Sequence, residues 1–367
     1  MPFQIIRNDI TRVKADAIVN TANPKPCFGR GTDSAIYQAA GVEQLLAARR
    51  QIGEIAPGQA VRTEAFALQA KHIIHTVGPE WNGGKSGERE VLRSCYENSL
   101  ELAAKLNCTS IAFPLISSGA YGFPKGEALN IALSEIGKFL LTHEMDIFLV
   151  VLSRKSLELS EALVGDIEQY IDEHAANGLL RSEYGSEYPA ETRRGRGREL
   201  HLFHARPEAD EDALYDGVME SLARESDREE TLKPMMAPCI PDRSEKSLDE
   251  VLNETGETFQ QRLLSLIDKS GMDEVTVYKK ANIDRKVFSR IRSRRDYRPR
   301  KKTAVAFAIA LELDMPTTRD LLSRAEFAFS PSNRFDLIVT YFIDHKIYDI
   351  FKINAALFRY GEQTLGE

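Results

Sequence analysis

Two loops rich in small residues hold the side chains best suited to chemistry. The first spans residues 20–33 (NTANPKPCFGRGTD) and the second residues 117–124 (SSGAYGFP). Glycine, asparagine and proline let such a backbone bend tightly and approach a ligand closely. A small-residue loop before a helix also exposes backbone N–H groups, which bind phosphate or diphosphate. The two loops predict a site for a phosphorylated small ligand, with Tyr121 and Phe123 covering a sugar or base.

Asp33, at the end of the first loop, is a candidate for acid–base chemistry. A carboxylate beside a water molecule can act as a general base or orient that water on an ester or glycosidic bond. We expect Asp33 at the start of a helix, as a possible N-cap, where the helix dipole favours its ionised form. A plain turn is the competing interpretation of each loop, because neither loop matches a dinucleotide or Walker pattern.

The loops need strands before them and helices after them, and the first 170 residues alternate in this way. Apolar segments of strand character lie at 4–11, 14–20, 60–66, 72–77, 110–117 and 147–152. Segments of helical character lie at 33–41, 89–107, 126–143 and 156–175. This alternation predicts an α/β layer fold with a mostly parallel sheet, in which ligands bind at the C-terminal ends of the strands.

Five motifs resemble those of one known family. They are NDIT (8–11), DAIVNTAN (16–23), GTDSAIYQAAG (31–41), HTVGPEW (75–81) and SSGAYGFP (117–124). In this order they resemble the macrodomain family over about residues 3–172, and in particular its branch of ADP-ribosyl hydrolases and O-acetyl-ADP-ribose deacetylases. The resemblance implies a three-layer α/β macrodomain that binds ADP-ribose or an ADP-ribosylated substrate.

The resemblance also implies roles for individual residues. Asp33 would be the catalytic carboxylate, and Asn23 would orient the distal ribose. Asp9 would accept a hydrogen bond from the adenine amino group, with the Ile10 backbone beside it. Further contacts with the ligand would come from Asn20, Gly31, Thr32, Ser117, Ser118, Gly119, Ala120, Tyr121 and Phe123, of which residues 117–121 would cradle the diphosphate.

The sequence departs from the family where four consecutive glycines are usual, because it has Phe28-Gly29-Arg30-Gly31 there. The two bulky side chains predict hindrance of a large protein-linked substrate. Arg30 could instead contact a phosphate or an acidic partner. Despite this departure we still expect the ligand to bind, but the sequence does not determine which substrate is preferred.

The composition of the chain limits the kinds of site and the cellular location that we expect. None of the four cysteines forms a C-x-x-C pair, so we expect no zinc cluster or disulfide framework, and a reducing, cytoplasmic location. The N-terminus lacks a signal-peptide pattern, and the chain lacks an uncharged apolar run of about 18 residues, so we expect no membrane segment. His72 and His75 have no cysteine or carboxylate at ligand spacing, so we predict no metal and no cofactor.

The rest of the chain divides into a linker and a helical region. From about Ala175 to Lys246 the alternation of strand and helix signals disappears, and we expect largely irregular chain. One short helix near Leu214–Ala223 is the alternative within this segment. Five candidate helical segments and a long aromatic stretch follow Ser247. We therefore expect three parts, namely a macrodomain at 1–174, a largely irregular linker at 175–246 and an all-α domain at 247–367.

The all-α domain carries a concentration of positive charge. The net charge of the chain is −7, but the 24 residues from Lys279 to Lys302 hold twelve Lys/Arg and two Asp, a local charge of +10. Residues 275–292 read as helix, tight turn and helix, and about residues 257–327 resemble a repressor/Cro-type helix-turn-helix domain. By that resemblance the second helix would enter the major groove of DNA. The predicted contact residues are Arg285, Lys286, Ser289, Arg290, Arg292 and Arg294.

Three functions fit these patterns. One is an enzyme that removes ADP-ribose from a modified macromolecule or deacetylates O-acetyl-ADP-ribose. Another is a non-catalytic ADP-ribose sensor coupled to a regulator-like domain. A third is an antitoxin-like protein that reverses a modification while its helical domain holds a partner. For that domain, a protein-binding module with a solvated charged face is the alternative to DNA binding.

Overall fold

A computed structural model describes residues 2–153, 161–184 and 256–366. The N-terminal part contains six strands, which follow the expected order. They are β1 (Phe3–Arg7), β2 (Ala17–Thr21), β3 (Ala60–Glu64), β4 (His72–Thr76), β5 (Ser110–Pro114) and β6 (Asp146–Val151). The strands form one sheet of order β1-β6-β5-β2-β4-β3. All neighbouring pairs are parallel except β3 and β4, so the sheet is mixed but mostly parallel, as predicted.

Helices connect these strands and cover the sheet. They are a 3-10 turn (Ile10–Arg12), α1 (Thr32–Ala40), α2 (Val42–Ile52), α3 (Glu88–Lys105) and α4 (Lys125–Thr142). The segment expected as a strand to Thr11 ends at Arg7, because Asp9 caps the 3-10 turn. Helix α2 was not expected from the sequence.

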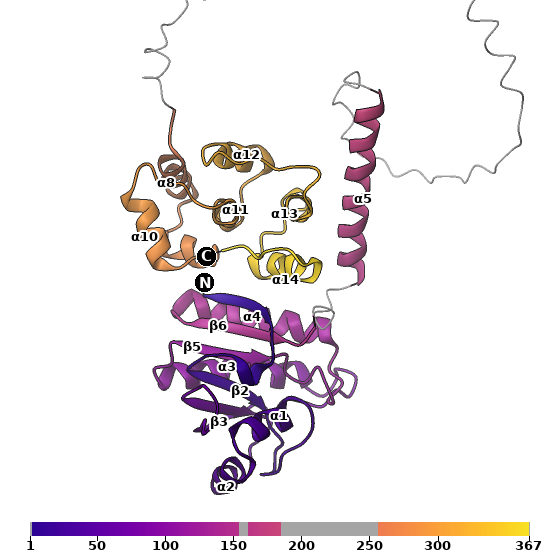
Figure 1. Ribbon diagram of the computed structural model, residues 1–367, viewed down its shortest axis with the longest axis vertical. Coiled ribbons are helices and arrows are strands. Elements are labelled where there is room, and N and C mark those ends of the chain that lie inside the picture. The colour runs from indigo at the N-terminus through magenta and orange to yellow at the C-terminus, as the bar shows by residue number, and fades with distance from the viewer. Residues whose placement is uncertain (1, 154–160, 185–255, 367) are drawn as a thin grey trace, which may run out of the picture. The chain divides into compact units, whose positions relative to one another are not determined.

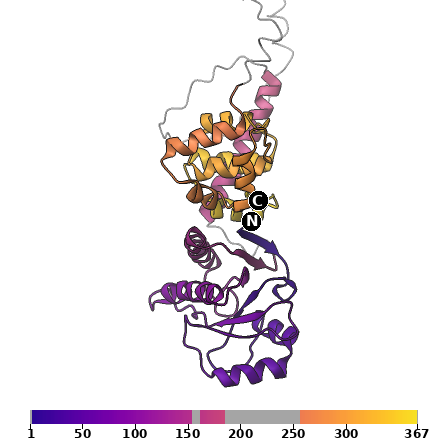
Figure 2. The same ribbon diagram turned by 90° about the vertical axis from the view of Figure 1, so that its left-hand side faces the viewer.

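Alternate residues of each strand face opposite cores, as the pleat requires. Val19 and Ile74 pack with α3 and α4, whereas Ile18 and Ile73 pack with α1 and α2. The sheet therefore lies between two helical layers, which Figures 1 and 2 show from two directions. This is the three-layer arrangement that was expected.

The remaining described elements are helical. They are α5 (Glu161–Tyr184), α8 (Phe259–Ser270), α9 (Glu274–Lys280), α10 (Arg285–Ser293), α11 (Lys301–Ala310), α12 (Met315–Ser323), α13 (Arg334–Asp344) and α14 (Ile350–Tyr360). Helix α5 continues past Ala175, where irregular chain was expected. The rest of the predicted linker, with the short helix considered at Leu214–Ala223, lies outside the described residues. The predicted domain boundaries stay a prediction.

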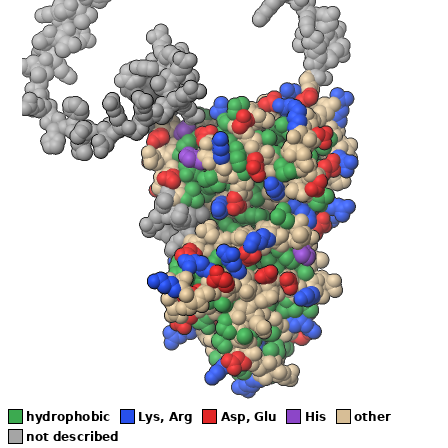
Figure 3. Space-filling view, turned by 180° about the vertical axis from the view of Figure 1, so that it is seen from behind, with side chains coloured by type: hydrophobic (Ala, Val, Ile, Leu, Met, Phe, Trp, Pro, Cys, Tyr) green, Lys and Arg blue, Asp and Glu red, His purple; other side chains and the backbone are tan. Residues whose placement is uncertain are grey.

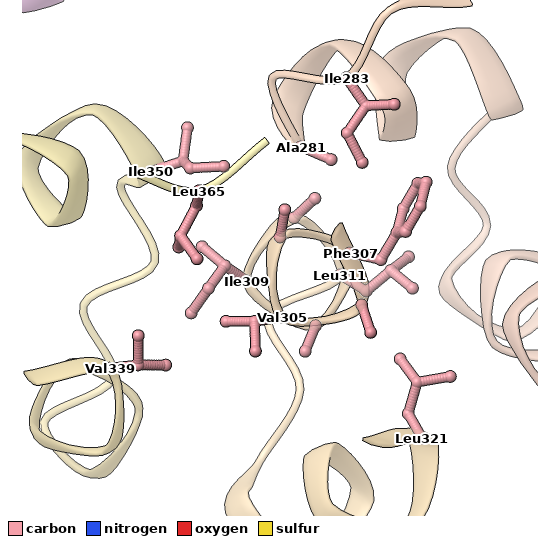
Figure 4. Packing of buried hydrophobic residues seen from close by; sticks show 14 of the residues in the cluster. Ala281, Ile283, Val305, Phe307, Ile309, Leu311, Leu321, Val339, Ile350 and Leu365 are labelled. Atoms are coloured by element: carbon pink, nitrogen blue, oxygen red, sulfur yellow. The ribbon is translucent and has the colours of Figure 1, made fainter. Parts of the chain in front are cut away.

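Helix α11 forms the centre of the helical part. Every residue from Thr303 to Ala310 is buried, and the neighbouring helices direct apolar side chains at it from several sides (Figure 4). The aromatic stretch forms α13 and α14, which pack into the same core. Asn282, in the turn between α9 and α10, exchanges two hydrogen bonds of 2.9 Å with the backbone of Phe3. The first strand and this turn are thereby joined.

Candidate functional site

The two predicted loops follow neighbouring parallel strands. The first connects β2 to α1, and the second connects β5 to α4. Since β2 and β5 pair in parallel, their C-terminal ends lie at the same edge of the sheet. Burial, then the negative charge of Glu80 and then that of Asp33, raise the pKa of Tyr121 in the second loop.

The Asp33 side chain is 3% exposed and is held by three donors. Its Oδ1 accepts a hydrogen bond of 2.6 Å from Asn20 Nδ2. Its Oδ2 accepts one of 2.6 Å from the Gly29 backbone N–H and one of 3.3 Å from Asn23 Nδ2. A carboxylate has about four acceptor positions. One acceptor position of Asp33 is therefore left for a water molecule or a ligand hydroxyl.

Asp33 is not the N-cap of α1, contrary to expectation. The N-cap is Gly31, which has a φ of 65° and makes no side-chain capping bond, and Asp33 is the second residue of the helix. Its carboxylate turns instead toward Asn20 and Gly29. The helix does end at Gly41, as expected.

Burial raises the pKa of Asp33 above its ordinary value. Opposing effects come from the Gly29 N–H, the Asn20 amide, the positive charge of Arg49 and the Asn23 amide, in that order. A carboxyl group with a raised pKa is a stronger base once it is ionised. The site therefore combines a buried base with a set of neutral donors that fix its orientation.

A chain of buried polar groups lies beneath Asp33. The Asn20 amide also approaches His75 Nδ1 at 3.2 Å, and His75 Nε2 lies 2.9 Å from the hydroxyl of Thr63. Because an amide nitrogen only donates, His75 Nδ1 accepts and its Nε2 carries the proton. Burial, and then the Arg49 charge, lowers the pKa of His75 to about 3. His75 is thus a neutral support that sets the direction of the Asn20 amide.

Two predicted ligand contacts are corrected by their burial. Asn20 has no exposed surface, so it supports Asp33 instead of touching a ligand. Phe123 is 1% exposed and packs on Trp81 with ring centroids 4.7 Å apart. It stabilises the base of the second loop and offers no face to a sugar or nucleobase.

The second loop presents backbone donors. The N–H groups of Gly119, Ala120 and Tyr121 have no hydrogen-bond partner among the described residues, and Gly119 and Ala120 are exposed. Around them, the Ser118 hydroxyl donates to the Leu115 carbonyl at 2.8 Å. Three consecutive free N–H groups on a fixed loop form a concavity that suits an anion.

Ser117 and Gly78 fit against each other at the base of this loop. Ser117 is buried with a φ of 61°, and its hydroxyl has no partner in the described part of the chain. A Cβ at position 78 would collide with that hydroxyl and with Ile116. Glycine is therefore required in the HTVGPEW motif so that β4 can approach the loop.

Asp9 lies at the end of β1, on the same sheet edge. Its Oδ1 accepts hydrogen bonds from the backbone N–H and hydroxyl of Thr11, at 2.9 and 2.8 Å. Its Oδ2 has no partner among the described residues. Ile10 is buried below it, which leaves only its backbone to contact a ligand. Gly31 and Thr32 stand at the N-terminus of α1, where helix N–H groups are free to donate.

Sequence reasoning missed three contributors to this site. Arg49 comes from the unexpected helix α2, and Thr63 from the antiparallel edge strand β3. For His75, on β4, the sequence predicted only that it binds no metal, and the structure shows that it supports the Asn20 amide. Spacing along the chain gives no signal for these residues, because they reach Asp33 only through the packing of separate elements.

Comparison with known proteins agrees with this geometry. The Macro domain family model matches residues 19–132. The O-acetyl-ADP-ribose deacetylase of Cronobacter sakazakii is 42% identical over 173 residues, which cover 46% of this chain and 96% of that protein. The protein of the same name from Escherichia coli is 40% identical and covers 44% and 94%, respectively. This chain belongs to the macrodomain family.

A solved structure of the Oceanobacillus iheyensis macrodomain with ADP is also similar to this chain. It is 39% identical, with a TM-score of 0.41, and covers 46% of this chain and 92% of that one. Each of these matches covers less than half of this chain, and the family model ends at residue 132. They therefore do not address the helices that follow α5.

The predicted DNA contacts lie in the helical part. Asn282 has a φ of 53°, and the Asp284 side chain caps α10, as expected for a tight turn between helices. Four predicted contacts, Arg285, Lys286, Ser289 and Arg290, are exposed on the face of α10 opposite its buried side chains. Arg292 is paired with Glu274 at 3.0 Å, and Arg294 is exposed just after the helix.

Part of the local positive charge is neutralised. Three further ion pairs are Lys280–Glu312, Arg298–Glu326 and Lys301–Asp336, at 3.5, 3.0 and 2.6 Å. In the described chain, seven cations of this segment have no ion pair, namely Lys279, Arg285, Lys286, Arg290, Arg294, Arg295 and Lys302. On the face in Figure 3, basic and acidic side chains are interspersed.

The described residues contain no group of three or more His, Cys, Asp or Glu side chains placed to hold a metal ion. Within the same residues, no helix combines the length and the hydropathy needed to cross a membrane.

Proposed function

We propose that this protein binds ADP-ribose along the C-terminal edge of its sheet and hydrolyses O-acetyl-ADP-ribose at Asp33. The proposal rests on Asp33, whose buried carboxylate is held by three donors. It also rests on the loop after β5, which has three free N–H groups in the described part of the chain. The relatives named O-acetyl-ADP-ribose deacetylase support it, because the matched region spans nearly their whole length.

The order of the strands suits an elongated ligand. Asp9 follows β1, the loop with the free N–H groups follows β5, and Asp33 follows β2, in the sheet order β1-β6-β5-β2. Neighbouring strands lie about 4.8 Å apart, so β1 and β2 are separated by about 14 Å. Adenine at Asp9, diphosphate at the β5 loop and the distal ribose at Asp33 follow this order.

The reaction needs one water molecule and no redox step. Asp33 accepts a proton from that water molecule while the oxygen of the water attacks the acetyl carbonyl carbon. The ester C–O bond then breaks, the ribose oxygen takes up a proton, and acetate and ADP-ribose are released. Asn23, hydrogen-bonded to Asp33, orients the distal ribose. Removal of ADP-ribose from a modified macromolecule would place its glycosidic bond at the same carboxylate.

Acetate release from O-acetyl-ADP-ribose tests this proposal. We expect turnover by the natural chain and a loss of about 10²- to 10⁴-fold in Asp33→Ala, the usual contribution of a general base. Asp268→Ala changes an exposed aspartate of α8 and serves as the matched control. Binding of ADP-ribose without turnover in the natural chain would instead identify a non-catalytic sensor.

We infer that the helical part binds DNA through α10. The observation in favour is the exposed row of Arg285, Lys286 and Arg290, which have no ion pair in the described chain. In a salt titration of duplex DNA binding, Arg290→Ala should reduce the slope of log K against log salt by about one. Arg319→Ala, on the exposed surface of α12, is the control. Salt-independent or absent binding would favour a protein partner.

A further inference from the structure

A buried arginine lies behind the catalytic carboxylate. Arg49, on α2, is 1% exposed. Its guanidinium donates to the Asn23 carbonyl at 3.3 Å and to the Gly53 carbonyl at 3.2 Å. Its Nε has no partner, and no carboxylate among the described residues lies within ion-pair distance of Arg49. The guanidinium is thus a buried charge with only partial compensation.

Stability alone does not account for such a residue. Burial of an unpaired charge costs several kcal/mol, whereas an apolar side chain at the same position would add to the core. The Gly53 carbonyl lies at the C-terminal end of α2, where the helix dipole favours a cation, but that gain is small beside the cost of burying the charge. A function for the charge is the better explanation.

The contacts of Arg49 connect it to the site in two ways. It fixes the backbone of Asn23, whose side chain bonds to Asp33. Its charge also opposes the rise that burial causes in the pKa of Asp33, and it lowers the pKa of His75 further. Burial raises the pKa of Tyr37 on α1 and the charge of Asp33 adds to this rise, whereas the positive charge of Arg49 opposes it.

We propose that Arg49 is a positioning residue that keeps Asp33 ionised and holds Asn23 in place for the reaction. The proposal rests on the proposed function, because it assigns Arg49 to the same chemistry. Asn20, Asn23 and Gly29 are neutral donors to Asp33, so Arg49 supplies the positive charge. The other titratable side chains around Asp33 are His75 from β4, Tyr37 from α1, Tyr121 from the β5–α4 loop with the nearby Glu80, and the Cys27 thiol.

Two substitutions separate the charge of Arg49 from its hydrogen bonds. Arg49→Gln retains an N–H donor for the Asn23 carbonyl but is neutral, and Arg49→Lys retains a positive charge. Arg50→Gln removes a charge from the exposed neighbour on the same helix and is the matched control. Thermal unfolding confirms that each variant is folded.

The measurement is the carboxyl titration of Asp33 by ¹³C NMR, with its signal assigned from Asp33→Asn. We expect Arg49→Gln to raise the titration midpoint by about one pH unit or more, the effect of losing a nearby opposite charge. Arg49→Lys and Arg50→Gln should leave it near its original value. An unchanged midpoint in Arg49→Gln, or an equal rise in Arg49→Lys or Arg50→Gln, would overturn the proposal.

A kinetic readout completes the test. In Arg49→Gln, the acid limb of the pH profile of kcat for O-acetyl-ADP-ribose should move to higher pH by the same interval as the NMR midpoint. The activity should therefore recover at higher pH. A loss of kcat that is equal at every pH would contradict the role in ionisation. The titration requires no substrate, so it decides the role of Arg49 even if the protein proves not to be a deacetylase.

Discussion

Replacement of Asn20 by leucine tests how the buried amide supports Asp33. Leucine has nearly the same shape, so the change removes hydrogen bonds without creating a large cavity. The lost bond to the Asp33 carboxylate, at 2.6 Å, is a hydrogen bond to a charged group and is worth about 1.5–3 kcal/mol. One pKa unit corresponds to about 1.4 kcal/mol. The pKa of Asp33 should therefore rise by about one to two units in Asn20→Leu.

The assay is the pH dependence of kcat for acetate release. Its acid limb should move upward by about one to two pH units, with kcat recovering above that range. Urea unfolding at pH 8 should also show a loss of about 2–4 kcal/mol, because His75 Nδ1 loses its donor. Asn98→Leu removes a 2.8 Å bond to the Gly58 carbonyl, which has no hydrogen bond to Asp33 or to its three donors, and is the control. An unmoved acid limb in Asn20→Leu would refute the reasoning.

Three further outcomes follow from the same structure. Gly78→Ala should weaken ADP-ribose binding about tenfold or more by calorimetry, because the added methyl group displaces Ser117; unchanged affinity would count against the loop geometry. Asn282→Ala should lower the free energy of unfolding by about 3 kcal/mol in urea, through two lost bonds to Phe3 and a left-handed backbone, and Asn282→Gly by about 1 kcal/mol less. Burial lowers the pKa of His75 to about 3, so His75 stays neutral in the folded protein while the unfolded chain takes up a proton there below pH 6.5. The contribution of His75 to stability is therefore full above pH 6.5 and is lost as the pH falls. Below pH 6.5, the free energy of unfolding of the wild type should fall by about 1.4 kcal/mol more per pH unit than that of His75→Phe. Equal slopes for the two proteins would contradict the neutral state of His75.

Much of the fold was predictable from local patterns. The apolar runs located all six strands, and the periodic segments located most helices within a few residues. Helix α2 was missed because charged residues interrupt its apolar face, which is anchored in the core by Leu45. The strand expected to Thr11 was too long, because the capping bond of Asp9 turns the chain after Arg7.

The site was predictable only in outline. The loop sequences indicated Asn23 and Asp33, and the structure joins them through a hydrogen bond. They could not show which side chains point into the core, so Asn20 and Phe123 were assigned as ligand contacts although neither has an accessible face. Burial depends on long-range packing, which loop composition does not encode.

Calorimetric titration with ADP-ribose tests the central claim most directly, because every proposed step requires that this nucleotide occupy the edge of the sheet. We predict saturable one-to-one binding that persists in Asp33→Ala and weakens in Gly78→Ala. Absence of binding at millimolar ADP-ribose, or an affinity that Gly78→Ala leaves unchanged, would contradict it.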